Sequence, residues 1–245
     1  MIEVRGLTKS FGPKQVLDGV DLSLSEGESL VVIGGSGTGK SVLLRCILGL
    51  EAPDAGQILW RGRPLADQRA EFMDGFGMLF QNAALFDSLP VWRNVAFRLL
   101  RTMPSARARD IAVEKLARVG LGPEVADLYP AELSGGMRKR AGLARAIAAD
   151  PKVIFFDEPT TGLDPIRAAA INALIRGIVD ETGASAITIT HDMTSVRAIG
   201  DRLALLDRGQ VRWQGPVSQM DHAQDEYLQD FIAGRARPMG SHPAG

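Results

Sequence analysis

The chain alternates short apolar runs with turn residues and with stretches that suit a helix. Predominantly apolar runs of strand length occur at 30–33, 77–80, 153–156 and 186–190. Runs of this length and character are typical of strands buried on both faces. We therefore predict the parallel sheet of an α/β fold, in which ligands gather beyond the carboxyl ends of the strands.

A second pattern, in which apolar and polar residues alternate, predicts half-buried antiparallel strands. It occurs at Ile2 and Val4 and again over 20–24, and the stretch 57–65 continues this antiparallel sheet. The turn residues at 207–210 predict a hairpin between two further strands.

The pattern becomes mainly helical from residue 82 to about residue 150. Gly120 suits the end of one helix in this region, and Ser134 suits the N-cap of the next. From Arg235 onward the chain is rich in proline and glycine, so we expect an extended tail. Before it lies one more amphipathic stretch, with an apolar face formed by Tyr227, Leu228, Phe231 and Ile232.

Composition gives no sign of an anionic partner. The 245 residues include 28 basic and 29 acidic ones, so no strong overall field draws the chain to nucleic acid or to an anionic membrane. The single cysteine, Cys46, excludes an internal disulfide and suits a reducing compartment. The sequence has no signal-peptide pattern and no apolar run near the roughly 18 residues of a membrane span. We therefore expect a soluble cytoplasmic chain.

The strongest motif is a glycine-rich loop of the form G-x-x-x-x-G-K-S, which lies between the apolar run at 30–33 and a helix-forming run at 42–48. Its glycines let backbone N–H groups and a helix N-terminus approach a polyphosphate. Lys40 is expected to reach the β and γ phosphates, and the Ser41 hydroxyl to bind Mg²⁺. A glycine-rich turn before a helix is the alternative, but the full pattern between strand and helix favours a nucleotide site. The eight residues of the motif are Gly34, Gly35, Ser36, Gly37, Thr38, Gly39, Lys40 and Ser41.

Polar residues follow the three later apolar runs: Gln81, the pair Asp157 and Glu158, and His191. Asp157 is placed to hold Mg²⁺. Glu158, expected on the other side of the pleat, is placed to orient or deprotonate a water that faces the γ phosphate. Gln81 can reach a metal or the attacking water, and His191 is interpreted as a γ-phosphate contact. The structural alternatives are an acidic turn at a strand end and an exposed histidine.

Two further features are weak when each is taken alone. Ser134, Gly135 and Gly136 open a helix whose N-terminus is stripped of side chains, which suits an anion. Phe11 lies in a turn about two dozen residues before the phosphate loop and is available to stack on an adenine. A core phenylalanine remains the alternative.

In this order and at these intervals, the motifs resemble the nucleotide-binding subunit of ATP-binding cassette (ABC) transporters over residues 1–220. The resemblance implies an α/β P-loop NTPase with a RecA-like parallel-sheet core, an antiparallel β subdomain and a helical subdomain inserted at about 85–150. It further implies residue roles: an adenine-stacking ring, a Q-loop glutamine, a signature, a catalytic glutamate, a D-loop aspartate and a switch histidine. These correspond to Phe11, Gln81, Ser134 with Gly135 and Gly136, Glu158, Asp164 and His191.

Subunits of this family dimerise head to tail, so the resemblance implies a homodimer. Each ATP, with Mg²⁺, would lie between the phosphate loop of one chain and the signature of the other. The implied partner is an integral membrane permease, which would hold the chain at the cytoplasmic face of the inner membrane, and no nucleic acid is implied. A C-terminal helix and tail at 221–245 would clasp the neighbouring subunit.

Finer features resemble the ATPase of Mla-type phospholipid transporters. Met137 stands where Gln is common and Val42 where Thr is common, and the segments 77–89 and 137–140 fit the same subfamily. This resemblance implies movement of phospholipid between the inner and outer membranes with an MCE-type lipid-binding protein and a small STAS-like subunit. The stretch at about 85–95 would contact the permease.

Other functions remain open on the sequence. The chain also suits the ATPase of another transporter, such as a small-solute importer or a lipoprotein-release system. A soluble ABC ATPase acting on ribosomes or DNA is less favoured, because such chains usually carry two cassettes or a long coiled-coil insertion. This chain has one cassette and no such insertion.

Overall fold

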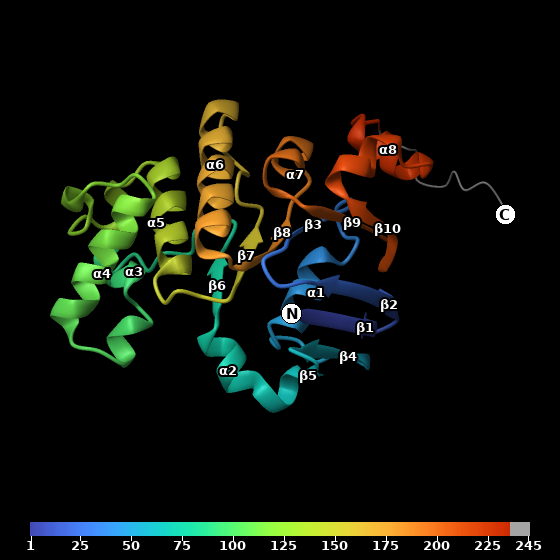
Figure 1. Cartoon of the computed structure of the whole chain (residues 1–245), viewed down its shortest axis with the longest axis horizontal. Coiled ribbons are helices and arrows are strands. Elements are labelled where there is room, and N and C mark those ends of the chain that lie inside the picture. The colour runs from blue at the N-terminus through green and yellow to red at the C-terminus, as the bar shows by residue number, and fades with distance from the viewer. Residues whose placement is uncertain (236–245) are drawn as a thin grey trace.

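The computed structural model describes residues 1–235 and shows an α/β fold built on two sheets (Figure 1). The strands of the larger sheet are β3 (Ser29–Ile33), β6 (Phe76–Leu79), β7 (Val153–Asp157), β8 (Ser185–Ile189), β9 (Arg202–Asp207) and β10 (Gln210–Pro216). Their order is β10-β9-β3-β8-β7-β6. All neighbours are parallel except β9 and β10, which form an antiparallel hairpin. The prediction of a buried parallel sheet is confirmed, since every residue of β3 and β8 is buried.

The smaller sheet is antiparallel and lies beside the first helix. Its strands, in order, are β2 (Lys14–Leu24), β1 (Ile2–Phe11), β4 (Ala55–Trp60) and β5 (Arg63–Pro64). Together with α1 (Lys40–Ile47) it encloses a core against one side of the larger sheet. Trp60, Phe72 and Phe155 meet edge to face in this core, with ring centroids 5.6 and 6.3 Å apart. The antiparallel pairing and the mixture of buried and exposed residues along β1 and β2 confirm the predicted half-buried strands.

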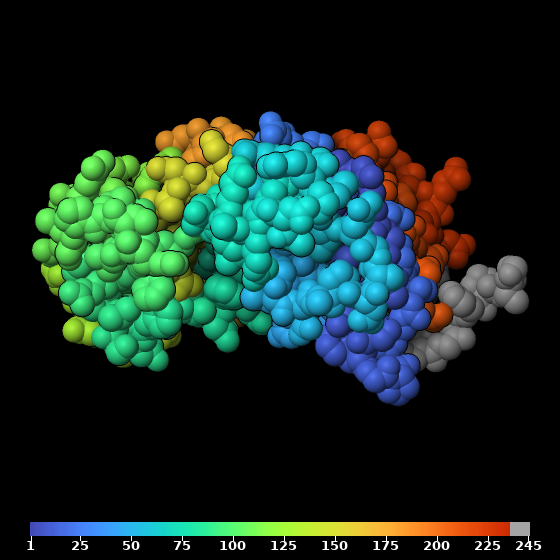
Figure 2. Space-filling view, turned by 90° about the horizontal axis from the view of Figure 1, so that it is seen from below, coloured from blue at the N-terminus to red at the C-terminus, as the bar shows by residue number. Residues whose placement is uncertain are grey.

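Helices cover the other side of the larger sheet and extend beyond its β6 edge. Figures 1 and 2 show that α3 (Val91–Val95), α4 (Ser105–Arg118) and α5 (Gly135–Ile147) form a lobe at one end of the molecule, whereas α8 (Glu226–Ile232) lies at the opposite end. The remaining helices are α2 (Arg69–Asp74), α6 (Pro165–Thr182) and α7 (Met193–Ile199). Short 3-10 turns occur at Leu65–Gln68, Leu99–Arg101, Pro123–Val125, Pro130–Glu132 and Val217–His222. Within residues 1–235, no helix combines the length and the apolar character needed to cross a membrane.

Helix α5 lies directly against strand β6. A Cβ built on Gly77 would overlap the carbonyl oxygen of Ala146, and one built on Gly142 would lie 2.9 Å from Leu79 Cδ1. Only glycine at these two positions allows the backbones to approach so closely. The helical lobe is thus anchored to the edge of the sheet through α5.

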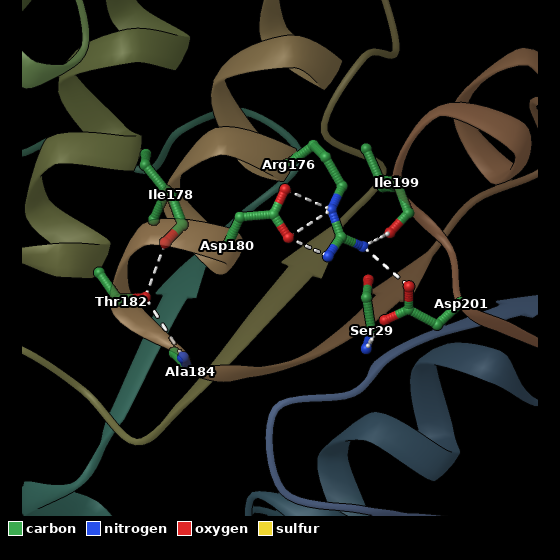
Figure 3. Close-up of polar contacts among 8 residues, drawn as sticks. All are labelled: Ser29, Arg176, Ile178, Asp180, Thr182, Ala184, Ile199 and Asp201. Carbon is green, nitrogen blue, oxygen red and sulfur yellow. Dashed lines mark hydrogen bonds and ion pairs between the residues drawn. The ribbon is translucent and has the colours of Figure 1, made fainter.

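Arg176 of α6 connects this helix to the C-terminal end of α7 and, through Asp201, to the start of β3 (Figure 3). Arg176 pairs with Asp180 on its own helix and with Asp201, 3.0 Å away, and it donates to the carbonyl oxygen of Ile199 at 3.4 Å. Asp201 in turn accepts a hydrogen bond from the backbone N–H of Ser29 at 2.8 Å. The hydrogen bonds that Arg176 donates to Asp180 raise the pKa of Arg176 still further, so the guanidinium stays charged. The cluster fixes the start of β3, whose other end leads into the phosphate loop.

Candidate nucleotide-binding site

The phosphate-loop motif lies where the sequence predicts it, between β3 and α1. Gly34 and Gly39 have positive φ values of 156° and 105°. A Cβ on Gly34 would overlap the carbonyl oxygen of Leu206, and one on Gly39 would lie 2.8 Å from the carbonyl oxygen of Val16. Glycine at these positions therefore lets the loop press against β9 and β2 while its backbone curves around a cavity.

Lys40, the first residue of α1, folds back into the loop. Its Nζ donates to the carbonyl oxygens of Gly34 at 2.7 Å and Gly35 at 2.8 Å. Burial lowers the pKa of Lys40, and the nearby Glu158 and Asp157 carboxylates oppose that effect. The ammonium is thus held by neutral oxygens inside the loop, where an anionic ligand would supply the compensating charge.

A cavity of about 730 Å³ opens over this loop at the carboxyl edge of the larger sheet. Gln81 follows β6, Asp157 ends β7 with Glu158 directly after it, and His191 follows β8; all four residues line the cavity. The structure therefore brings these four predicted residues together although they are far apart in sequence. The loop contributes Gly34, Gly35, Ser36, Gly37, Lys40 and Ser41 to the lining.

The two adjacent carboxylates have different surroundings. Burial raises the pKa of Asp157, and the charge of Glu158 adds to the increase, whereas Lys139, Lys40 and Arg45 oppose it. Glu158 has a φ of 47°, a left-handed conformation that is uncommon for residues other than glycine. Such strain persists only where surrounding contacts enforce it.

Contacts to both the backbone and the carboxylate hold Glu158 in place. Its backbone N–H donates to the carbonyl oxygen of Ile189 at 2.8 Å, its Oε2 accepts from Thr161 Oγ1 at 2.9 Å, and its Oε1 lies 2.9 Å from His191 Nδ1. Residues alternate across a pleat only inside a strand, and β7 ends at Asp157. The predicted placement of Glu158 by the pleat is therefore wrong. The left-handed turn, and not the pleat, directs its carboxylate towards His191.

Three predicted features lie away from this cavity. Ser134 caps α5 through its hydroxyl, which accepts a first-turn backbone N–H at 3.3 Å, and Asp164 caps α6 in the same way at 3.0 Å. Phe11 is 45% exposed at the turn between β1 and β2, with Lys9 Nζ 5.3 Å from its ring centroid. The lining of the cavity, within the described part of the chain, does not include Phe11, Ser134, Gly135, Gly136 or Asp164.

Two groups near the site were not predicted to be there. The first is Phe231, Gly234 and Arg235, which line the cavity over the phosphate loop of their own chain. The amphipathic pattern of α8 is visible in the sequence, but the surface that such a helix covers is set by tertiary packing. The clasp of a neighbouring subunit by 221–245 stays a prediction, and 236–245 lie outside the described residues.

The second group is Lys139, which is buried on α5. Its Nζ donates to the carbonyl oxygens of Gln81 and Glu158. In the sequence it reads as one of several basic residues after the signature. Its helical spacing is the signal that could have found it, because Gly142 and Ala146, three and seven residues later, share the face that packs on β6.

A glycine-rich loop between strand and helix, with a lysine in the loop and an acidic end on a strand of the same sheet, defines a P-loop NTPase. The additional antiparallel sheet and the helical lobe make it one of the cassette type.

Comparison with known proteins agrees with this class. The ABC transporter family profile matches residues 17–161. The probable ribonucleotide transport ATP-binding protein mkl of Mycobacterium tuberculosis is 41% identical over 240 residues, covering 96% of this chain and 67% of the relative. Protein TRIGALACTOSYLDIACYLGLYCEROL 3, chloroplastic, of Arabidopsis thaliana is 39% identical over 255 residues, covering 96% and 74%. The methionine import ATP-binding protein MetN of Leifsonia xyli is 41% identical over 227 residues, covering 89% and 66%.

Among solved structures, the fold is similar to the ATP-binding cassette MJ0796 in a dimeric post-hydrolysis state bound to ADP and Pi. The TM-score is 0.80 at 29% identity, covering 89% of this chain and 99% of that one. The chain therefore belongs to the ABC transporter family. It is the ATP-binding motor ATPase of an ABC transporter.

Proposed function

We propose that this chain is the ATPase of a transporter that moves phospholipid between the inner and outer membranes. The observation that carries the ATPase part is the convergence of Lys40, Asp157 and Glu158 on one cavity over the phosphate loop. The lipid part is supported by Met137 and Val42, which resemble Mla-type ATPases. It is also supported by the relative whose name contains a galactosyl diacylglycerol lipid.

The phosphate loop would bind the polyphosphate of ATP. The loop and the first residues of α1 line the cavity, and Lys40 would exchange its two carbonyl partners for phosphate oxygens. Phe11, with its ring half exposed, is available for the adenine to stack on.

The oxygen donors of Ser41, Gln81 and Asp157 fit Mg²⁺, because this hard cation prefers oxygen ligands and takes the rest of its shell from phosphates and water. All three residues line the same cavity. The chemistry that Mg²⁺ supplies in such sites is neutralisation of the charge on the phosphates. Since burial raises the pKa of Asp157, a cation beside it would favour the ionised carboxylate.

Glu158 would orient the attacking water and accept its proton. Both of its carboxylate oxygens are held, one by Thr161 and the other against His191. This arrangement fixes the direction in which a water can donate to the carboxylate. His191 would then contact the γ phosphate, and Gln81 would help to position the water or the metal.

Ser134, Gly135, Gly136 and Asp164 would act in the site of a second copy of the chain. They lie away from the cavity of their own chain, and head-to-tail pairing would bring them to the nucleotide of the partner. The dimeric state of the structural relatives supports this pairing. The hydroxyl of Ser134 and the free N–H groups at the start of α5 suit the charge that develops on the γ phosphate.

The remaining subunits are proposed from the resemblance. Residues 1–220 would form the ATPase domain, with the helical subdomain inserted at about 85–150, and 221–245 would form the dimer clasp. A permease would contact the chain near 85–95, where Phe86 is 45% exposed. It would hold the chain at the cytoplasmic face of the inner membrane, together with an MCE-type lipid-binding protein and a small STAS-like subunit. Nucleic acid would play no part.

Substrate-dependent ATPase activity tests this function. The measurement uses this chain with its permease in detergent micelles free of phospholipid, with phospholipid, methionine or ribonucleotide added in turn. Phospholipid is expected to raise the turnover rate several-fold, and a Lys40→Ala complex should not respond to it. Stimulation by methionine alone would instead support the second candidate, small-solute import, which the similarity to MetN favours.

A further inference from the structure

We propose that Lys139 is a positioning residue for ATP hydrolysis, which joins helix α5 to the two strand ends that carry Gln81 and Glu158. The inference rests on the ATPase function proposed above. Only 6% of Lys139 is exposed, and it lies on α5 five residues after the cap Ser134. Among the described residues it does not line the cavity over the phosphate loop, so it acts through other groups.

Lys139 donates its hydrogen bonds just beyond the last paired residues of β6 and β7. Strands β6 and β7 pair in parallel up to Leu79 and Phe156, where their register ends. Lys139 Nζ donates to the carbonyl oxygen of Gln81, two residues past that pair on one side, and to that of Glu158 at 3.2 Å on the other. One ammonium thus connects the two segments beyond the point where β6 and β7 stop pairing with each other.

The position of this ammonium is set by the contact between α5 and β6. Gly142 lies one turn after Lys139 and allows the close approach of helix and strand. From the same helix, Arg145 donates to the carbonyl oxygens of Ala83 and Ala84, each at 2.6 Å. Helix α5 therefore holds the whole turn that follows β6, with Lys139 at the end nearest the nucleotide cavity.

The surroundings of Lys139 compensate a charge that would otherwise be costly to bury. Burial lowers its pKa, and the charges of Asp157 and Glu158 oppose that effect. An apolar residue of similar length would leave the carbonyls of Gln81 and Glu158 without this donor. Because α5 also begins beside Ser134, a shift of this helix would move a signature and a catalytic segment together.

Three variants of the full chain separate positioning from folding: Lys139→Met, Lys139→Arg, and the matched control Arg138→Met at the exposed neighbouring position. In Lys139→Met we expect kcat for ATP to fall by about 10-fold or more, because small displacements of catalytic groups are costly. KM and the affinity for a fluorescent ATP analogue should stay within about threefold. Lys139→Arg should recover most of the loss, because it restores a cationic donor, and Arg138→Met should match the wild type.

Hydrogen exchange of the nucleotide-free protein gives a second readout that does not depend on activity. Amides at 80–84 and 158–161 should exchange faster in Lys139→Met, with those of β1 and β2 unchanged. A wild-type kcat in Lys139→Met, or unchanged exchange in both segments, would overturn the proposal. If that variant does not fold, Lys139→Gln, which keeps a neutral donor, is judged by the same two criteria. An inactive wild-type chain would refute the proposed ATPase and leave the exchange test of Lys139 valid.

Discussion

At the scale of single residues, the backbone of Glu158 determines what its carboxylate can do. The φ of 47° takes the chain out of β7 and turns the side chain towards His191. The hydrogen bonds to Ile189 and Thr161 hold this strained conformation. Both carboxylate oxygens therefore have a partner, an arrangement that suits the general base proposed above.

Glu158→Gln should separate binding from hydrolysis. The amide can still accept from Thr161, so the site should keep its shape, but it cannot take a proton from water. We expect kcat to fall by about 100-fold or more while the affinity for ATP changes little. Steady-state turnover and equilibrium binding of a fluorescent ATP analogue check this. Turnover within a few-fold of the wild type would remove Glu158 from the catalytic role.

The residues that could be predicted from the sequence are those that stand out from their immediate sequence neighbours. Gly34 and Gly39 reveal a loop because no other residue fits there, and Asp157 and Glu158 stand out because charges are rarely tolerated next to a buried strand. Nothing in the neighbouring sequence distinguishes Lys139 in this way. Its burial depends on the closeness of α5 and β6, and a helical lysine is usually exposed.

At the scale of elements, the contact between α5 and β6 attaches the helical lobe to the strand that leads to Gln81. Gly77→Ala should disrupt it, because the new Cβ would overlap the carbonyl oxygen of Ala146. We expect a loss of about 1–3 kcal/mol in the free energy of unfolding. The matched control is Gly177→Ala on α6, where the new Cβ meets open space and should stabilise by up to about 1 kcal/mol. Denaturant unfolding measures both, and equal effects would contradict the close contact.

The N-terminus of α7, next to His191, gives a pH-dependent prediction. Asp192 accepts from the backbone N–H groups of Thr194 and Ser195 and from the Ser195 hydroxyl at 2.6 Å. Burial alone would raise the pKa of Asp192, but these hydrogen bonds outweigh it and lower the pKa. The stability that the ionised Asp192 carboxylate gives to the folded protein is therefore fully present above the unfolded-state pKa of about 3.9. It is lost as the pH falls through the lower folded-state pKa.

Asp192→Ala should accordingly cost about 1 kcal/mol of stability at pH 7, and its difference from the wild type should narrow below about pH 3.9. Thermal unfolding of both proteins at pH 7 and pH 3 measures this difference. A gap of the same size at both values would show that the cap acts without its charge.

The elements themselves were largely predictable, because apolar runs and alternating runs differ in period. Their arrangement was not. The sequence does not state that β4 pairs with β1, or that β8 lies between β3 and β7, since pairing is chosen by the packing of whole faces. The surface covered by α8 escaped prediction for the same reason.

At the scale of the whole molecule, the two proposed parts of the nucleotide site lie apart within one chain. The phosphate loop lines one cavity, whereas Ser134 and Gly136 line a separate hollow beside Met137 and Arg167. A second copy in head-to-tail contact would join each loop to the signature of its partner, which agrees with the dimeric relatives. Closing and reopening of that dimer would then transmit the energy of ATP to the permease.

Mixed dimers test this central claim most directly. Lys40→Ala should inactivate the loop, and Ser134→Arg should block the signature, so each homodimer is expected to be inactive. In a mixed dimer, one site combines an intact loop from one chain with an intact signature from the other. Random mixing should therefore recover about a quarter of the wild-type ATPase activity, because half the dimers are mixed and half their sites are intact. No recovery on mixing, or a fully active Ser134→Arg homodimer, would contradict the shared site.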